Sequence, residues 1–255
     1  MIAAYGYFCM KANQLVRRYF VLFIALSLAG FGVALTTKAE VGISSLASTA
    51  YVISVYFPVT MGVMLIVFNV LSLVLQPPLM SKEERKAQFV NMMLQIPALF
   101  AFGLFVDFFM WVMQDFNPSD FGYIVCLAIF ILGSVITAIN IILQAIADVA
   151  KIACDAFVIV LAKRFNFNLG RVKLVFDTAF VVAAAIISLI CSGFSEIIGI
   201  REGTIIGTII VGPCVTLLSP YFKFVENWIS KSQPSTATST SVASVSEESK
   251  ASIKQ

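Results

Sequence analysis

The sequence contains no histidine and few charged residues. Histidine is the commonest general base near neutral pH and the commonest metal ligand, so its absence argues against enzymatic and metal-binding functions. Nucleophile-elbow, phosphate-loop and H-E-x-x-H motifs are absent as well. No C-x-x-C spacing occurs among the five cysteines, which are Cys9, Cys126, Cys154, Cys191 and Cys214. We therefore predict a protein that is not an enzyme and has no catalytic residues, no metal and no cofactor.

Apolar residues, by contrast, are abundant. They make up 60% of the 255 residues, against 12% charged residues, and the mean hydropathy is +0.95. A soluble domain has about half apolar and about a quarter charged residues. A helix that spans the bilayer needs about 20 apolar residues, and uncharged runs of about this length recur along the chain. The sequence predicts an all-α polytopic protein in the lipid bilayer, and its net charge of +3 gives no reason to expect a nucleic-acid partner.

One stretch of the chain resembles another. Residues 39–69 align without a gap on residues 147–177, at an offset of 108 residues. The doublet Phe68–Asn69 then corresponds to Phe176–Asp177. Other identical pairs include Ala39/Ala147, Val41/Val149, Val52/Val160, Phe57/Phe165 and Gly62/Gly170. Repeats in membrane proteins commonly place a pathway at the interface between the halves, so we expect the functional residues there.

Eight apolar segments divide the chain. They are 19–37, 46–57, 60–77, about 92–114, 122–146, 149–162, 174–193 and 203–222. A secretory signal has an apolar core of only about 7–15 residues, so the first segment predicts a retained span. The segments 46–57 and 149–162 are short, and each precedes a glycine, Gly62 or Gly170, where we expect a turn.

The loop cations favour six spans. If all eight segments crossed the bilayer, the loop with Lys82, Arg85 and Lys86 would lie outside, against the positive-inside rule. If the two short segments are re-entrant or interfacial helices, this loop and both termini face the cytoplasm. Each half then contributes three full spans, and the halves form inverted repeats. Eight spans with parallel repeats are the alternative.

We expect a single transmembrane domain, residues 1–231. Repeat 1 covers about residues 15–115, and repeat 2 covers about residues 121–222. The remaining residues, 232–255, are rich in serine, threonine and charge. Such a composition buries too little apolar surface to fold, which predicts a disordered cytoplasmic tail.

Polar side chains inside apolar spans are the first candidate functional residues. A carboxylate at the centre of a span costs about 2.5–3.5 kcal/mol, so Asp107 and Asp177 each require a reason. Asn69 is the repeat counterpart of Asp177. Hydrogen bonding between helices is the simpler explanation, but it contributes only about 0.6 kcal/mol in membranes. We therefore expect all three residues to line a substrate or ion pathway.

Polar residues also gather before the short helices. In the first half, Glu40, Ser44 and Ser45 flank Gly42, which permits a sharp turn, and serines can cap a helix N-terminus that suits an anion. In the second half, spacings of three and four place five polar residues near one helical face. These are Asn140, Gln144, Asp148, Lys151 and Asp155. An ordinary capped, partly solvated helix start is the alternative interpretation.

Two segments carry motifs that resemble a known family. Residues 32–45 read GVALTTKAEVGISS, and residues 199–204 read GIREGT, with Gly212–Pro213 following. They are similar to the GIAL..KA.LG.SP and G.REGT…VGP motifs of the YczE/YyaS/YitT family of bacterial membrane proteins. Where that family usually has a Pro-Gly-x-Gly turn, residues 146–151 read IADVAK. The resemblance covers about residues 15–225 and implies a multi-pass protein of the bacterial cytoplasmic (inner) membrane, without implying an activity.

Two functions fit these features. The first is a secondary transporter or permease for a small polar or anionic solute, which binds at the short-helix N-termini while Asp177, with Asp107 or Asp148, carries a coupling proton or cation. Six spans are few for a lone carrier, which makes a homodimer reasonable. The second is a non-transporting membrane partner that stabilises or regulates other membrane or biosynthetic proteins. If Asn69, Asp107, Asp148 and Asp177 are dispersed toward lipid or packed against backbone with no shared cavity, the transporter hypothesis should be dropped.

Overall fold

The computed structural model describes residues 12–118, 122–192, 203, 211 and 214–230. These residues are overwhelmingly helical and contain no strand, as the sequence predicts. The elements are α2 (Ala12–Lys38), α3 (Ser45–Tyr56), α4 (Met61–Leu79), α5 (Lys82–Val112), α6 (Tyr123–Ala147), α7 (Ala153–Phe165), α8 (Leu169–Cys191), the 3-10 helix η2 (Ser219–Phe222) and α10 (Lys223–Ser230). The predicted tail and the segment 193–202 lie outside the described residues.

Five of the described helices are long and apolar enough to cross a bilayer. The candidate spans are Val16–Lys38, Met61–Leu79, Gln88–Val112, Tyr123–Ala147 and Leu169–Cys191. They confirm the prediction of a multi-pass helical membrane protein, and the first of them contains the predicted first span.

The helix ends follow from local sequence. Ser81 and Glu84 form a capping box at the start of α5, and the hydrogen bonds from Ser81 lower the pKa of the Glu84 carboxyl. Thr60 accepts a hydrogen bond from the Val63 amide at the start of α4. After α2 and after α6 the chain turns through left-handed residues, Glu40 (φ 55°) and Asp148 (φ 46°). These two residues are counterparts at the 108-residue offset, so the two halves share a backbone feature as well as a sequence pattern.

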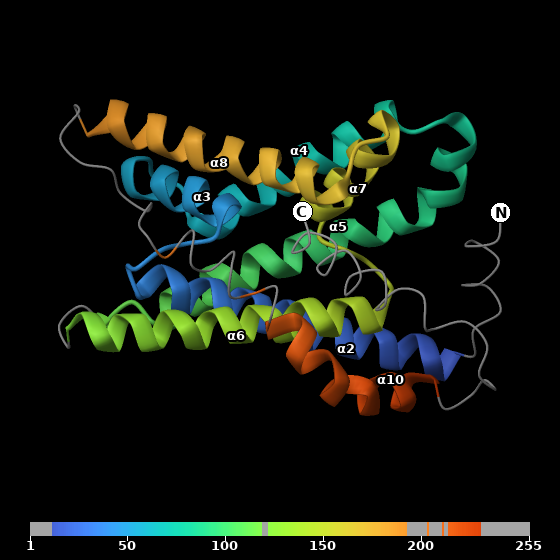
Figure 1. Cartoon of the computed structure of the whole chain (residues 1–255), viewed down its shortest axis with the longest axis horizontal. Coiled ribbons are helices and arrows are strands. Elements are labelled where there is room, and N and C mark those ends of the chain that lie inside the picture. Colours follow the sequence, from blue (N-terminus) through green and yellow to red (C-terminus); the bar gives the residue numbers. More distant parts are fainter. Residues whose placement is uncertain (1–11, 119–121, 193–202, 204–210, 212–213, 231–255) are drawn as a thin grey trace.

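The helices form two layers in Figure 1, with α2 and α6 in one and α3, α4, α7 and α8 in the other, while α5 crosses between them. Helix α2 packs against α6 and α5, α4 packs against α5, α3 packs against α8, and α7 packs against α4. Glycines permit the closest approaches. A Cβ atom on Gly32 would lie 2.8 Å from Thr137 Oγ1 of α6, and one on Gly30 would lie 2.7 Å from Phe105 Cβ of α5.

The short helices are half the length of a span. Helix α3 has 12 residues and α7 has 13, which gives about 18–20 Å at 1.5 Å per residue, against a hydrocarbon core of about 30 Å. Helix α3 runs parallel to the second half of α8, since Ser45 contacts Asp177 and Thr49 contacts Phe180. Helix α7 folds back on the first half of α8. The two short helices therefore begin near the middle of α8 and run toward opposite ends, as Figure 1 shows.

Two predictions of local structure were wrong. Gly62 and Gly170 are each the second residue of a long helix, α4 or α8, and do not form the preceding turns. The five polar residues from Asn140 to Asp155 do not share one helical face, because α6 ends at Ala147 and α7 begins at Ala153. The left-handed conformation of Asp148 interrupts the helix that the spacing had indicated.

Candidate functional site

A group of charged and polar side chains lies where α3, α7 and α8 meet. Ser45 is the first residue of α3, Asp155 is in the first turn of α7, and Lys173 and Asp177 are one turn apart on α8. We call these four residues the central cluster. Asp177 is about 12 Å from the start of α8, at 1.5 Å per residue, so the cluster lies well inside a candidate span.

The central cluster is organised around one ammonium group. Lys173 Nζ is 3.0 Å from Asp155 Oδ1 and 3.3 Å from Asp177 Oδ1, and Ser45 Oγ donates to Asp177 Oδ1 at 2.8 Å. The side chain of Asp177 is 26% exposed, and those of Lys173 and Asp155 are about half exposed. Two carboxylates beside one ammonium leave the cluster with one formal negative charge.

A second polar group ties the start of α7 to α4. Asn69 is fully buried; its Oδ1 accepts from the Cys154 amide at 3.1 Å, and its Nδ2 donates to the Leu65 carbonyl at 2.8 Å. Gln76 donates to the Ala153 carbonyl at 3.2 Å and to Gln95 Oε1 at 3.1 Å. Ser72 Oγ lies 3.1 Å from Cys154 Sγ. We call the set Asn69, Ser72, Gln76 and Gln95 the amide ladder.

The two groups have a reciprocal arrangement. Asn69 of α4 holds the N-terminus of α7, and its sequence counterpart, Asp177 of α8, holds the N-terminus of α3. Each residue thus binds the short helix of the other half of the chain. Asn69 contacts backbone amide, whereas Asp177 contacts a hydroxyl and an ammonium.

The N-cap residues of the short helices do not cap them with their own side chains. Ser44 is the N-cap residue of α3, but its side chain makes no capping hydrogen bond, and the N-cap residue of α7 is the apolar Ile152. The predicted serine cap is therefore wrong for Ser44, and Ser45 contacts Asp177 instead. Helix N-termini carry partial positive charge, so the N-terminus of α3 and that of α7 each favour an anionic group nearby.

The structure places Asp107 and Asp148 apart from the central cluster. Asp107, near the end of α5, accepts from the Gly62 amide at 2.7 Å and from Thr60 Oγ1 at 2.6 Å, so it caps α4. Asp148 is exposed in the linker after α6, with Oδ2 3.9 Å from Arg18 Nη1. Both residues lie at helix ends, where a charge needs no pathway to explain it.

The remaining predicted residues are also separated. Glu40 and Lys151 are exposed in the two linkers. Asn140 is buried within α6, where its Oδ1 accepts from Gln144 Nε2 at 2.7 Å. Of the segment 199–204, only Gly203 is described; its amide donates to the Val41 carbonyl at 3.0 Å, in the first linker. Of the eleven residues predicted for the site, Ser45, Asp155 and Asp177 meet in the central cluster. Asn69 lies beside the start of α7, the helix that carries Asp155.

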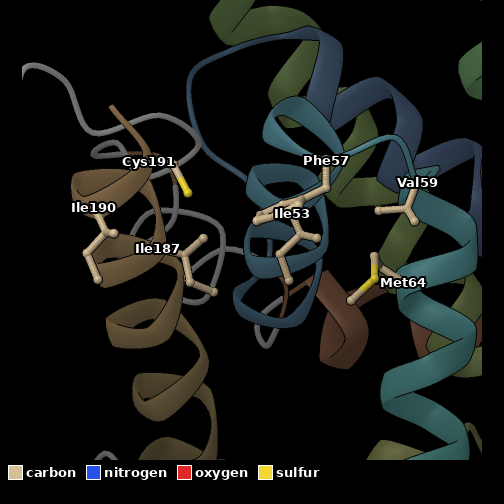
Figure 2. Close-up of a pocket in the computed structure, with 7 residues that line it drawn as sticks. All are labelled: Ile53, Phe57, Val59, Met64, Ile187, Ile190 and Cys191. Atoms are coloured by element: carbon tan, nitrogen blue, oxygen red, sulfur yellow. The ribbon is translucent and has the colours of Figure 1, made fainter. Parts of the chain in front are cut away.

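Two apolar hollows lie among the described residues. The larger, about 510 Å³, lies between α3, α4 and α8, and Figure 2 shows its lining. The lining residues are Ile53, Phe57, Val59, Met64, Ile187, Ile190 and Cys191. A second hollow of about 270 Å³ lies between α2, α6 and α10. Neither of these two hollows is lined by Asn69 or by any of the three aspartates.

Sequence reasoning missed Lys173 and most of the amide ladder. The positions of Asn69, Ser72 and Gln76 differ by three and four, which is the spacing of one helical face, so this polar stripe on an apolar helix was available as a signal. Lys173 lies close in the sequence to other cations, such as Arg171, so it resembles an ordinary solvated cation at a helix start. Its role depends on contacts with α7 that the sequence alone does not give.

Comparison with known proteins shows which family the chain belongs to, but it gives no activity. A model described as a family of unknown function (DUF6198) matches residues 16–220. The chain belongs to this family. The match begins in α2 and ends within η2, so it includes the central cluster and the amide ladder and leaves out α10. No curated protein and no solved structure matches the chain.

Proposed function

We propose that this member of the family is a secondary transporter or permease for a small polar or anionic solute, with its site at the central cluster. The observation that carries the proposal is the meeting of two half-length helices, N-terminus to N-terminus, beside Lys173 and Asp177 inside a candidate span. Broken helices of this kind form the solute sites of many secondary transporters.

Inverted repeats are part of the proposal. Each short helix packs on a long helix of the other half, α3 on α8 and α7 on α4. Glu40 and Asp148 turn the chain with the same left-handed conformation. We infer six full spans plus α3 and α7 as re-entrant helices, both termini in the cytoplasm, and a bacterial inner-membrane protein related to the YczE/YyaS/YitT family. A pseudo-two-fold axis in the membrane plane would relate the Asn69 and Asp177 contacts.

The charges in the central cluster support a functional role. A carboxylate near the centre of a span, such as that of Asp177, costs about 2.5–3.5 kcal/mol on insertion scales, and a purely structural helix contact does not need it. Burying an ion pair is also weak evidence for stability, because desolvation offsets the attraction. The dispersal of Asp107 and Asp148 counts against a four-residue pathway, so the proposal is confined to Ser45, Asp155, Lys173 and Asp177.

A non-transporting membrane partner is the second candidate function. The apolar lining of both hollows favours it, because a solute site needs polar groups facing a cavity. Under this hypothesis the central cluster and the amide ladder only fasten the short helices to α8 and α4. Substitution of Asp177 would then alter stability but no ligand response.

A solute screen separates the two functions. The purified protein is tested by thermal shift against small carboxylates, amines, sugars and polyols, and any stabilising solute is carried into a proteoliposome uptake assay. We expect Asp177→Asn to weaken the response about tenfold, equivalent to about 1.4 kcal/mol, and Lys173→Met to do likewise. The exposed Asp115 is the matched control, and Asp115→Asn should keep the wild-type response. Solute responses that survive both cluster substitutions would remove the central cluster as the site.

A further inference from the structure

Helix α10, the last helix among the described residues, forms a small amphipathic element at one end of the bundle. It packs against α2 and α6, and Figure 1 shows it beside these helices. Ile229 is buried and Val225 packs against the main core, whereas Phe224 is 76% exposed. An amphipathic helix with exposed aromatic residues is typical of a segment that lies in the membrane interface.

A basic residue fastens α10 to the first span. Arg17 Nη1 donates to the Trp228 carbonyl at 2.9 Å, and the guanidinium lies 5.0 Å from the centroid of the Trp228 ring. A guanidinium has five N–H donors, so Arg17 keeps donors for an anionic group. Lys223 begins α10, and it is exposed. The described residues around this end therefore present cations at the border of a span.

An apolar groove lies directly beside these cations. The hollow of about 270 Å³ between α2, α6 and α10 is lined by Phe20, Ile24, Leu143, Phe224 and Trp228, among others. Trp228 thus belongs to both the groove wall and the Arg17 contact. The combination of an apolar groove with cations at its edge matches a molecule that has an apolar chain and an anionic head.

We propose that the α2–α6–α10 groove binds an anionic phospholipid, with an acyl chain against Phe20, Ile24 and Leu143 and the phosphate at Arg17. The arginine fork matches phosphate geometry, and basic pockets between transmembrane helices at the cytoplasmic side are known to select anionic headgroups. The proposal is independent of transport, because the groove lies against α10 and not at the central cluster.

Tryptophan quenching tests the proposal. The chain has two tryptophans, so Trp111→Phe leaves Trp228 as the only one. The variant is reconstituted in vesicles of phosphatidylcholine that contain a small fraction of phosphatidylglycerol, with bromine on the acyl chains of one lipid or the other. We expect brominated phosphatidylglycerol to quench Trp228 with about a five-fold preference per molecule, the effect of about one basic residue near the surface. Equal quenching by the two lipids would overturn the proposal.

Four further variants identify the source of the preference. In the Trp111→Phe background, Arg17→Gln should abolish the preference for phosphatidylglycerol, and Lys86→Gln, an exposed cation at the start of α5, should retain it. Leu143→Phe narrows the groove and should reduce quenching by both lipids. If Arg17→Gln does not fold, Arg17→Lys tests the same contact. This variant keeps the charge but loses the arginine fork, so the preference for phosphatidylglycerol should weaken if the phosphate contact is specific. If Lys86→Gln removed the preference as fully as Arg17→Gln does, the preference would come from general surface charge and not from the groove.

Discussion

Asn69 and Asp177 occupy equivalent positions in the two halves, but they meet different physical requirements. Asn69 is fully buried, and a neutral amide tolerates this because both ends of its side chain have backbone partners. Asp177 keeps a quarter of its side chain exposed and lies beside Lys173. A carboxylate in the place of Asn69 would face an acceptor carbonyl without a counter-charge. The two equivalent positions therefore differ in charge, and the charged residue is the one on α8.

Asp107 is predicted to act through stability alone. Its carboxylate holds the Gly62 amide and the Thr60 hydroxyl, so Asp107→Ala should lower the free energy of unfolding by about 1–3 kcal/mol, the range for a lost cap and for hydrogen bonds to a charged group. Asp107→Asn keeps one acceptor and should cost less. Unfolding in mixed micelles measures both, with Asp115→Asn as the control. A stable Asp107→Ala protein would show that the cap contributes little.

At the residue scale, the sequence predicted only part of the site. The cost of charge in a span and the internal repeat pointed to Asn69 and Asp177, which the structure places at the starts of α7 and α3. The same argument failed for Asp107, because proximity to the end of a neighbouring helix supplies its partners. It also missed Lys173, since a lysine near a helix start is ordinarily a solvated cation. Contacts between different helices decide these roles, with Gly62 of α4 for Asp107 and with Asp155 of α7 for Lys173.

At the element scale, the two short helices were identified by their length, but their meeting point was not predictable. A 12-residue apolar helix is shorter than a typical span, yet nothing in its sequence says which long helix it follows. The turn before α3 was expected at Gly42, since glycine adopts left-handed conformations at low cost. The chain turns at Glu40 instead, a residue that rarely adopts positive φ. Tertiary packing of the linker outweighs the local preference there.

The paired glycines Gly62 and Gly170 should respond in opposite ways to the same substitution. A Cβ atom on Gly62 would collide with the Gly103 carbonyl and the Asp107 side chain, whereas one on Gly170 would meet only Asn168 Oδ1 at 3.3 Å. Gly62→Ala should destabilise the protein by about 1–3 kcal/mol, as overpacking does. Gly170→Ala should leave stability unchanged or raise it by up to about 1 kcal/mol, because alanine favours the helix.

The glycine pair is a matched experiment within one chain. Both residues are second in their helices and occupy the same repeat position, so helix propensity affects both alike. Unfolding in mixed micelles measures the two variants under identical conditions. Equal effects at the two positions would contradict the close approach of α4 to α5. A loss that Gly103→Ala reproduces would support it, since Gly103 faces Gly62 and Ile66.

At the scale of the whole molecule, the direction of each helix determines the topology. Lys38 donates to the Gln114 carbonyl, so the ends of α2 and α5 lie together. Arg18 donates to the Ala147 carbonyl, so the start of α2 lies beside the end of α6. In the proposed six-span topology α3 and α7 do not cross the membrane, so successive long helices alternate in direction. Ser81 and Asp115, at the two ends of α5, should then lie on opposite sides of the membrane.

Cysteine labelling tests this topology directly. In a variant whose five native cysteines are replaced by alanine, Ser81→Cys and Asp115→Cys are exposed in intact cells to a maleimide that does not cross the membrane. With six spans and a cytoplasmic N-terminus, Asp115→Cys reacts at once and Ser81→Cys reacts only after permeabilisation. Eight spans reverse both results, because α3 would carry the chain to the other side before α4. Ser81 and Asp115 are both exposed, so accessibility does not bias the comparison.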